Sequence, residues 1–400
     1  MRRPAESFPV AMLTLLRNAT VFAPTALGRR HLLIGGERVL WMGERLDALP
    51  SALEVDEVDL EGARLIPGLI DGHAHLTGGG GEAGPQSRVP APPLSRYTLG
   101  GVTSVVGVLG TDDVTRSTGE LLVTARALIA EGISAWCHTG GYHLPPVTLT
   151  GSVRGDIVHV DRIIGVGEVA ISDHRSSQPT LQELLRLGAD AHVAGLMTGK
   201  AGIAHLHVGD GVRGLSLIRE ALQASELPAR TFQPTHVNRR RALFDEAMVL
   251  ARDVGCTVDI TDFPVAIDED AWSAADALER WWGSGAPEHR VTVSSDGGGC
   301  LPEFDADGQV VRMAVGDSRA LAATVAELLR RGHALERILP PFTSTVAAYL
   351  RLPGKGIVAV GADADLVVLE GDGGVRDVMA RGAWHVRAGR AVRGGTFERE

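Results

Sequence analysis

Residues 64–76 read RLIPGLIDGHAHL, an apolar run that ends in two histidines separated by one residue. A short apolar run bounded by turn residues is typical of a buried β-strand. Amphipathic segments, whose apolar residues recur at intervals of three and four, separate it from further runs of the same kind. Seven further apolar runs of this kind begin at Gly101, Gly132, Ile163, Gly202, Thr231, Cys256 and Arg290.

Eight strands that alternate with helices over short connections pair in parallel and close into a barrel. We therefore predict the α/β class, with a (β/α)8 TIM barrel over residues 65–350. The structural alternative is an open, doubly wound parallel sheet. Residues 1–64 and 351–400 contain hairpin-like runs separated by glycine and proline. We expect these two segments to meet in one smaller β-rich domain that flanks the barrel.

The composition is that of an ordinary globular protein, with 44% apolar and 22% charged residues in a chain of 400. The formal net charge of -10 argues against a nucleic acid as partner. No apolar run approaches the roughly 18 residues that a membrane-spanning helix requires. We therefore expect neither a nucleic-acid nor a membrane partner.

The three cysteines, Cys137, Cys256 and Cys300, are widely spaced and form no C-x-x-C pair. This pattern indicates neither a disulfide framework nor a structural zinc site, and it fits a reducing compartment. The N-terminal run VAMLTLL is interrupted by Arg17 and has no small-residue cleavage signal, so we expect no signal peptide. The expected location is the cytoplasm.

Polar side chains fall at the predicted carboxyl ends of the strands, where TIM barrels carry their active sites. They are His73, His75, Glu168, His207, His236 and Asp296. Side chains two positions apart on a strand point to the same face, so His73 and His75 can bind one ion together. Imidazole and carboxylate groups suit zinc and similar divalent ions. The set predicts a metal site, with two ions if one carboxylate lies between them.

Each of these residues has a structural alternative when it is taken alone. An H-x-H pair can be two hydrogen-bonded histidines at the end of a barrel strand. Glu168 can pair with a buried arginine, and Asp296, which precedes three glycines, can be a turn residue. His205 shares a face with His207 but can simply donate a hydrogen bond lower in the barrel. The six residues together favour the metal site.

Several motifs resemble the amidohydrolase superfamily of metal-dependent hydrolases. They are PGLIDGHAHL in the first predicted strand, the distant strand-end aspartate, and DADLVVL near the end of the chain. More narrowly, the chain resembles the isoaspartyl dipeptidase family, whose members cleave β-aspartyl peptide bonds. This resemblance covers residues 60–397 and is carried by HLTGGGGEAGP, GVTSVVGVLGTD, EGISAWCHTGGYHLP, ISDHRS, LPARTFQPTHVNR and VTVSSDGGG.

The resemblance implies two divalent metal ions, with zinc as the expected metal, and a homo-oligomer, in particular an octamer. His73 and His75 would bind one ion, and Asp296 would contact metal and carry protons. His207 and His236 would bind the second ion. The implied substrate pocket contains Gly80, Gly81, Glu82, Thr111, Tyr142, Arg175, Arg239 and Cys300.

The same resemblance assigns roles within that pocket. Glu82 would bind the free α-amino group of a β-aspartyl dipeptide. Arg175 and Arg239 would face its carboxylates, because a planar guanidinium donates two parallel hydrogen bonds. Without the resemblance, a surface ion pair between Glu82 and an arginine is the simpler interpretation.

Two positions depart from the family pattern. The family bridges its metals with a carboxylated lysine on the fourth strand, whereas this chain has Glu168 there, preceded by an additional Gly167. The only lysines, Lys200 and Lys355, lie outside that strand. A glutamate carries the same charge on a shorter arm, so we predict a Glu168 bridge and a closer strand. Cys300 stands where the family has a serine, and a thiol is the weaker hydrogen-bond donor.

The predicted reaction is hydrolysis of a β-aspartyl dipeptide by a hydroxide that bridges two metal ions. Tyr142 and one metal would stabilise the oxyanion, and Asp296 would carry the proton to the leaving amine. One alternative is another amidohydrolase, similar to dihydroorotase or aminoacylase, that acts on cyclic amides or N-acyl amino acids and does not need Glu82. The other is a non-catalytic scaffold that keeps the barrel.

Overall fold

The computed structural model describes residues 13–45, 49–50, 52–305 and 307–398. Residues 1–12, which include the start of the N-terminal run where we expect no signal peptide, lie outside these ranges. Within the part of the chain that is described, no helix has the length and apolar character needed to cross a membrane.

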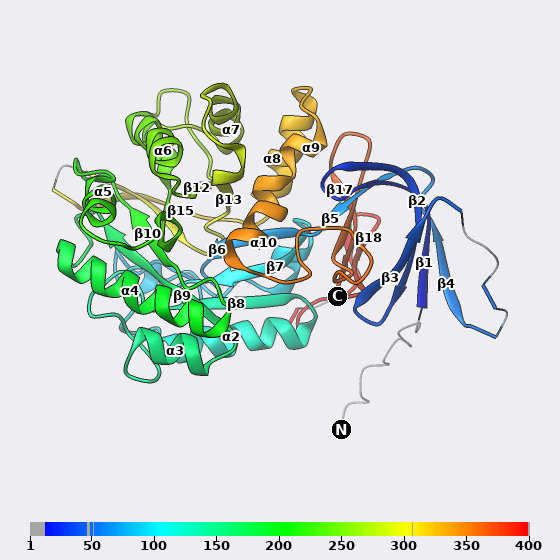
Figure 1. The fold of residues 1–400 in the computed structure, drawn as a ribbon, viewed down its shortest axis with the longest axis horizontal. Helices are drawn as coiled ribbons and strands as arrows, with labels where there is room; N and C mark the ends of the chain where they lie inside the picture. Colours follow the sequence, from blue (N-terminus) through cyan, green and yellow to red (C-terminus); the bar gives the residue numbers. More distant parts are fainter. Residues whose placement is uncertain (1–12, 46–48, 51, 306, 399–400) are drawn as a thin grey trace.

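A nine-stranded sheet combines strands from both ends of the chain (Figure 1). Its order is β19-β18-β17-β16-β5-β1-β2-β3, and β4 pairs with β1. The N-terminal strands are Leu13–Phe22 (β1), Ala26–Gly35 (β2), Arg38–Gly43 (β3), Val55–Asp59 (β4) and Arg64–Pro67 (β5). The C-terminal strands are Leu366–Leu369 (β16), Val375–Ala380 (β17), Ala383–Arg387 (β18) and Arg390–Ala391 (β19). The two ends thus meet in one β-rich unit, as predicted, while the exact domain boundaries stay a prediction.

The eight predicted barrel strands are all present. Six of them pair in parallel in chain order: Leu69–Ala74 (β6), Val102–Gly107 (β7), Ser134–Thr139 (β8), Ile163–Ile171 (β9), Ala204–Val208 (β10) and Phe232–Thr235 (β11). Two more form a parallel pair: Val258–Thr261 (β12) and Val291–Ser294 (β13). The first predicted strand is in fact two, because Gly68 separates β5 of the small sheet from β6 of the barrel. Parallel strands that alternate with helices confirm the predicted TIM-barrel fold.

Helices follow the barrel strands and cover them on the outside (Figure 1). They are Leu94–Thr98 (α1), Thr118–Glu131 (α2), Val153–His159 (α3), Leu181–Thr198 (α4), Ser216–Gln223 (α5), Arg241–Val254 (α6), Ala274–Gly283 (α7), Ala320–Arg330 (α8), Leu335–Ile338 (α9) and Ser344–Leu350 (α10). Helix α4 begins with a capping box, in which Thr180 and Glu183 satisfy each other's backbone N–H groups. Such caps fix where a helix begins, and hence where the preceding strand-end loop stops.

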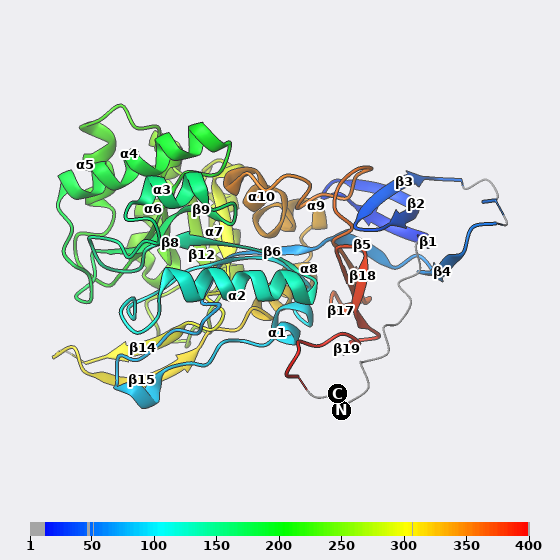
Figure 2. The same cartoon turned by 90° about the horizontal axis from the view of Figure 1, so that it is seen from below.

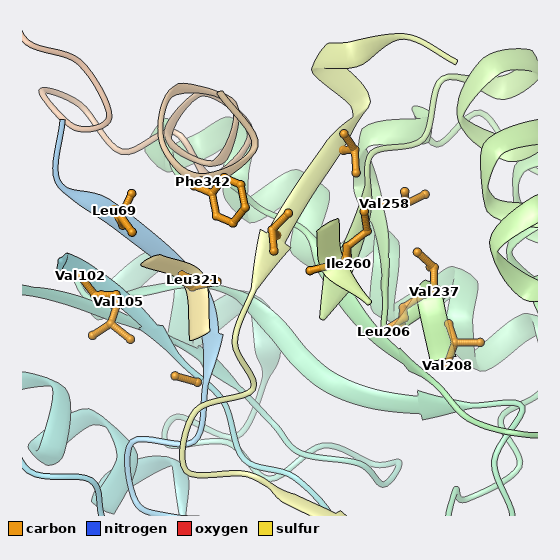
Figure 3. Packing of buried hydrophobic residues seen from close by; sticks show 14 of the residues in the cluster. Leu69, Val102, Val105, Leu206, Val208, Val237, Val258, Ile260, Leu321 and Phe342 are labelled. Atoms are coloured by element: carbon orange, nitrogen blue, oxygen red, sulfur yellow. The ribbon is translucent and has the colours of Figure 1, made fainter. Parts of the chain in front are cut away.

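Short 3-10 turns complete the connections at Pro85–Ser87, Ala229–Thr231, Val237–Arg239, Glu288–Arg290 and Pro340–Phe342. The largest apolar cluster of the described residues joins side chains of the barrel strands to those of the surrounding helices. Figure 3 shows side chains of this cluster, among them Leu69 and Val102 on the neighbouring strands β6 and β7, Ile260 on β12, and Phe342 from the C-terminal part of the barrel. These four side chains are at most 1% exposed. Their burial supplies the main stabilisation of the barrel.

The barrel closes where β6 meets the segment that follows β13. Ala74 forms a parallel bridge with Gly297, and the amide of Asp296 donates to the carbonyl of His73 over 3.1 Å. The fully buried Asp71 accepts hydrogen bonds from the amide and the hydroxyl of Ser295. This seam therefore places His73 and Asp296, 223 positions apart in sequence, side by side.

Strand β9 contains a bulge at the additional residue that precedes Glu168. Ala204 of β10 pairs with Val166, but Leu206 pairs with Val169, so β9 has one more residue than its partner in this interval. Gly167 has φ of 150°, and a Cβ there would lie 2.6 Å from the carbonyl oxygen of His205. Bulges re-aim side chains next to active sites. The bulge presents Glu168 to the barrel mouth.

The substitution Gly167→Ala is expected to lower the free energy of unfolding by on the order of 2 kcal/mol, because the new Cβ overlaps backbone atoms at a strained φ. Urea unfolding of the metal-free chain measures this. The control is Gly283→Ala at the end of α7, where a Cβ meets nothing within 4 Å. Equal stability of the two variants would contradict the bulge.

An antiparallel hairpin that we did not predict follows the barrel closure. It consists of Cys300–Phe304 (β14) and Val310–Val315 (β15). Figure 2 shows this hairpin along one edge of the barrel, away from the nine-stranded sheet. It supplies side chains to the pocket described below.

Candidate active site

The structure brings the six predicted metal ligands together at the mouth of the barrel. They lie on or directly after β6, β9, β10, β11 and β13: His73, His75, Glu168, His207, His236 and Asp296. All six are buried, with exposures between 0% and 6%. Below, "the cluster" means these six side chains.

In one half of the cluster, two histidine nitrogens and two carboxylate oxygens face one another. Nε2 of His73 lies 3.5 Å from Oε2 of Glu168 and 3.4 Å from Oδ1 of Asp296. Nε2 of His75 lies 3.7 Å and 3.0 Å from the same two oxygens. Ligands at about 2.1 Å from a tetrahedral zinc ion are roughly 3.4 Å apart. The observed spacing therefore fits one divalent cation.

The other oxygen of Glu168 faces a different pair of histidines. Oε1 lies 2.7 Å from Nδ1 of His207 and 2.8 Å from Nε2 of His236. One ligand atom from each of these three residues falls within a span of 4.8 Å. The two oxygens of Glu168 thus point to two potential cation positions, as a bridging carboxylate requires.

Several of these atoms have no partner among the described residues. Nε2 of His73, Oε2 of Glu168 and Oδ1 of Asp296 are buried and accept or donate no hydrogen bond there. Unpaired polar atoms in a protein interior are unfavourable. A cation that binds all three would remove this penalty, so the donor set fits a metal.

The buried carboxylates and histidines of the cluster shift one another's pKa values. Burial raises the pKa of Glu168, but His73 and His207 outweigh it and hold that pKa well below the usual range. His73 and His75 likewise keep the pKa of Asp296 low against burial. Burial lowers the pKa of His73, whereas Glu168 and Asp296 raise it to about 9. The two carboxylates therefore attract positive charge, which bound protons or a metal can supply.

Two side chains that sequence reasoning missed hold histidine rings of the cluster. Oδ2 of Asp173 lies 2.9 Å from Nε2 of His207. Oγ1 of Thr261 lies 2.6 Å from Nδ1 of His236. In both rings the other nitrogen faces Glu168, an arrangement common among metal-binding histidines. Asp173 lies in the motif ISDHRS beyond β9, which was the available signal.

Neither lysine reaches the cluster. Nζ of Lys200 donates to the carbonyls of Ile157 and Val160 at the opposite end of the barrel strands. Nζ of Lys355 lies 2.6 Å from Oδ2 of Asp365, next to the small sheet. No lysine therefore contributes to the cluster, and Glu168 is the carboxylate that faces both pairs of histidines.

A pocket of about 850 Å³ opens above the cluster. Seven of the predicted substrate residues line it: Gly80, Glu82, Thr111, Tyr142, Arg175, Arg239 and Cys300. Gly81 belongs to the predicted set but does not line the pocket. The hairpin adds Leu301, Phe304 and Arg312, which were not predicted.

Glu82 lies in this pocket with one oxygen unpaired. Its Oε1 accepts a hydrogen bond from the hydroxyl of Thr111 over 3.0 Å and lies 3.5 Å from Nη1 of Arg175. Its Oε2 is buried and has no partner in the described chain. The contact with Arg175 exists, but both side chains are at most 12% exposed, so it is not a surface ion pair.

Arg175 is held in a fixed position. It donates to both oxygens of Asp173, over 3.1 Å and 2.8 Å. Its guanidinium lies between two aromatic rings, 5.4 Å from the centroid of Tyr142 and 5.1 Å from that of Phe304. Arg239 is more exposed, and its Nη1 lies 4.0 Å from Asp210. Arg175 and Arg239 therefore both present guanidinium groups to the pocket.

The hydroxyl of Tyr142 points into the cluster. It lies 2.8 Å from Nδ1 of His207, and the side chain is 5% exposed. Burial and the nearby charge of Glu168 raise the pKa of Tyr142 well above its ordinary value. Its hydroxyl therefore keeps its proton at neutral pH and can donate a hydrogen bond.

Comparisons with known proteins find solved structures that are similar to this chain over nearly its full length. A crystal structure of β-aspartyl dipeptidase from Fervidobacterium islandicum AW-1, in complex with the dipeptide β-Asp-Leu, is 40% identical, with a TM-score of 0.90 over 95% of this chain and 98% of that chain. Dihydropyrimidinase from Brevibacillus agri, at 19% identity and a TM-score of 0.64 over 96% of this chain and 97% of that one, shares the fold. No model of a protein family matches.

Curated relatives include imidazolonepropionases. The enzyme of Serratia proteamaculans is 33% identical over 129 residues, so the match spans about a third of its length, 31%, and 30% of this chain. The enzyme of Anaeromyxobacter sp. is 27% identical over 96% of this chain and 95% of its own length.

The barrel, the β-rich sheet and the cluster of histidines and carboxylates define a hydrolase of the amidohydrolase superfamily, whose members depend on metal. Within that superfamily the chain belongs to the β-aspartyl dipeptidase family, because it is 40% identical to such an enzyme over nearly the full length of both chains. Members of this family are hydrolases that act on peptide bonds.

Proposed function

We propose that this chain hydrolyses β-aspartyl dipeptides. The observation that carries this proposal is the unpaired Oε2 of Glu82, which lies in the pocket above the cluster. A buried carboxylate oxygen without a partner favours a positively charged ligand group. The α-ammonium group of a β-linked aspartyl residue is such a group. The complex of the Fervidobacterium enzyme with β-Asp-Leu supports the same substrate.

The cluster would hold two divalent cations, for which zinc is the expected metal. His73, His75 and Asp296 would bind one, His207 and His236 the other, and Glu168 both. Cations bound there lower the pKa of water and polarise the substrate carbonyl. The coordinating histidines must release their protons to bind them.

The reaction is the addition of water to the side-chain amide carbonyl of the β-aspartyl residue, followed by loss of the amine. Asp296, whose pKa is held low, is ionised and can accept a proton from the attacking water. The same carboxyl then gives that proton to the leaving nitrogen. Tyr142 keeps its own proton and donates a hydrogen bond to the developing oxyanion.

Two arginines would orient the dipeptide by its carboxylates. Arg175 is fixed by Asp173 and by two aromatic rings, so it can donate to a carboxylate with little loss of side-chain entropy. Arg239 lines the same pocket and is more exposed. Cys300 at the start of β14 also lines it, and burial raises the pKa of its thiol to about 12, so it stays neutral.

The substitution Glu82→Gln tests this function. It is expected to lower kcat/KM for β-Asp-Leu by roughly 10²-fold, because the substrate ammonium loses its buried counter-charge. Hydrolysis of N-acyl amino acids, if any, should not change. The control is Glu269→Gln, which also lines the pocket but accepts from the amide of Ala266 rather than from Thr111 or Arg175, and which should leave kcat/KM unchanged.

Unchanged hydrolysis of β-Asp-Leu by Glu82→Gln would favour the alternative amidohydrolase. Absence of bound metal and of any hydrolysis after metal supplementation would favour the non-catalytic scaffold. The cytoplasmic location and the homo-oligomeric, octameric state stay predictions.

A further inference from the structure

A continuous chain of polar side chains crosses the interior of the barrel beneath the cluster. Its members come from strands β6, β10, β11, β13 and β12: His73, His205, Gln233, Thr292 and Asp259. All of them are at most 4% exposed. TIM barrels usually fill this space with branched apolar side chains. A buried polar chain is less favourable than such a core unless each group is paired, so its presence calls for a reason.

The direction of the hydrogen bonds follows from the lower end of the chain. Asp259 accepts from the hydroxyls of Thr235, Thr292 and Ser294, over 2.8 Å, 2.5 Å and 2.5 Å. An ionised carboxylate only accepts hydrogen bonds, so each of these three hydroxyls donates to Asp259. The hydroxyl of Thr292 donates over the shortest distance to Asp259, rather than over 3.4 Å to the carbonyl of Val258, and it therefore accepts in its hydrogen bond with Gln233.

The directions of the hydrogen bonds made by Gln233 and His205 follow from this. Nε2 of Gln233 donates to Oγ1 of Thr292 over 3.1 Å, which leaves Oε1 of the same amide 3.0 Å from Nδ1 of His205. An amide oxygen only accepts, so Nδ1 of His205 carries the proton. A neutral imidazole has one donor and one acceptor nitrogen, so Nε2 of His205 accepts.

The last link reaches the cluster. Nε2 of His205 lies 2.8 Å from Nδ1 of His73, which must then be the donor. With its proton on Nδ1, neutral His73 has its lone pair on Nε2. That atom faces Glu168 and Asp296 and has no hydrogen-bond partner in the described chain.

We propose that His205 is a positioning residue: through Gln233, Thr292 and Asp259 it fixes the tautomer of His73 that presents Nε2 to a cation. This inference rests on the proposed metal-dependent function. It assigns a role to a histidine that touches neither the pocket nor the second ligand pair. Outer hydrogen-bond partners of a metal-binding histidine raise metal affinity by roughly 10- to 100-fold.

A neighbouring histidine provides a matched control. The ring of His138 on β8 is stacked on that of His205, with centroids 5.5 Å apart and planes 9° apart. It makes no hydrogen bond to another side chain in the described chain. His138 and His205 thus share the same layer of the barrel, but only His205 belongs to the polar chain.

The test measures Zn²⁺ affinity by competition with a chromophoric chelator, together with thermal unfolding of the metal-free protein. Gln233→Met is expected to weaken Zn²⁺ binding by roughly 10- to 100-fold. Thr292→Val, which keeps the shape of threonine, should weaken it as well, whereas Thr292→Ser should keep wild-type affinity. His138→Leu should also leave affinity unchanged. Excess Zn²⁺ should restore kcat in the weakened variants without a change in KM.

Wild-type affinity in both Gln233→Met and Thr292→Val would overturn the proposal, as would an equal loss in His138→Leu. If Gln233→Met does not fold, the Thr292→Val and Thr292→Ser pair decides alone. A wild-type chain that binds no divalent cation and hydrolyses no β-Asp-Leu after metal supplementation would instead overturn the proposed function.

Discussion

The variant Asp296→Asn is expected to hydrolyse β-Asp-Leu with a kcat lowered by roughly 10²- to 10⁴-fold, which is the usual contribution of a general acid–base group. The amide keeps the shape of the side chain and one oxygen, but it cannot take a proton from water at neutral pH. Asp296 also lies 3.4 Å and 3.0 Å from the two histidines of the first cation position. Zinc content must therefore be measured in parallel, and kcat compared at full loading.

A second buried aspartate serves as the control. Asp262 follows β12, as Asp296 follows β13, and burial raises its pKa to about 6. It contacts no member of the cluster, so Asp262→Asn should keep wild-type kcat. An Asp296→Asn enzyme that is fully loaded with zinc and retains more than about a tenth of wild-type kcat would contradict the proposed proton transfer.

The variant Glu168→Gln is expected to lose zinc from both positions and to lose activity by roughly 10²-fold or more, because removal of one partner from buried charges is strongly destabilising. Both oxygens of Glu168 face histidines, whereas glutamine offers one oxygen and one NH₂ group. Metal analysis after dialysis, followed by kcat in excess zinc, measures the two effects separately.

The control for this variant is Glu246→Gln. Glu246 lies on α6 and pairs with Arg219 outside the barrel mouth, so zinc content should not change. A Glu168→Gln chain that keeps two zinc ions and full activity would show that Glu168 is not the bridge.

The barrel could be predicted because its strands are short apolar runs of recognisable length. All eight strands were predicted. Strands such as β7, β9 and β10 are buried along their whole length, and amphipathic helices separate them in the sequence. The β14–β15 hairpin was missed. Its residues are mostly half-exposed or exposed, so the sequence lacks the apolar run that marks a buried strand.

The six cluster residues could be located because parallel strands place their carboxyl ends at one mouth. The residues that form hydrogen bonds with these histidines could not be predicted from the sequence. Asp173, Thr261 and Gln233 are ordinary polar residues, and only the closed barrel brings them within hydrogen-bond distance of histidines up to 34 positions away. Strand periodicity gives the face on which His205 lies, but not the atom that it contacts.

The presence of a glutamate at position 168, rather than a carboxylated lysine, affects how the site is assembled. A carboxylated lysine forms only when its amine has captured carbon dioxide, and both lysines of this chain are hydrogen-bonded elsewhere. A glutamate side chain carries its carboxylate without any modification after translation. Reconstitution of the metal-free protein should therefore proceed equally well in buffers with and without bicarbonate.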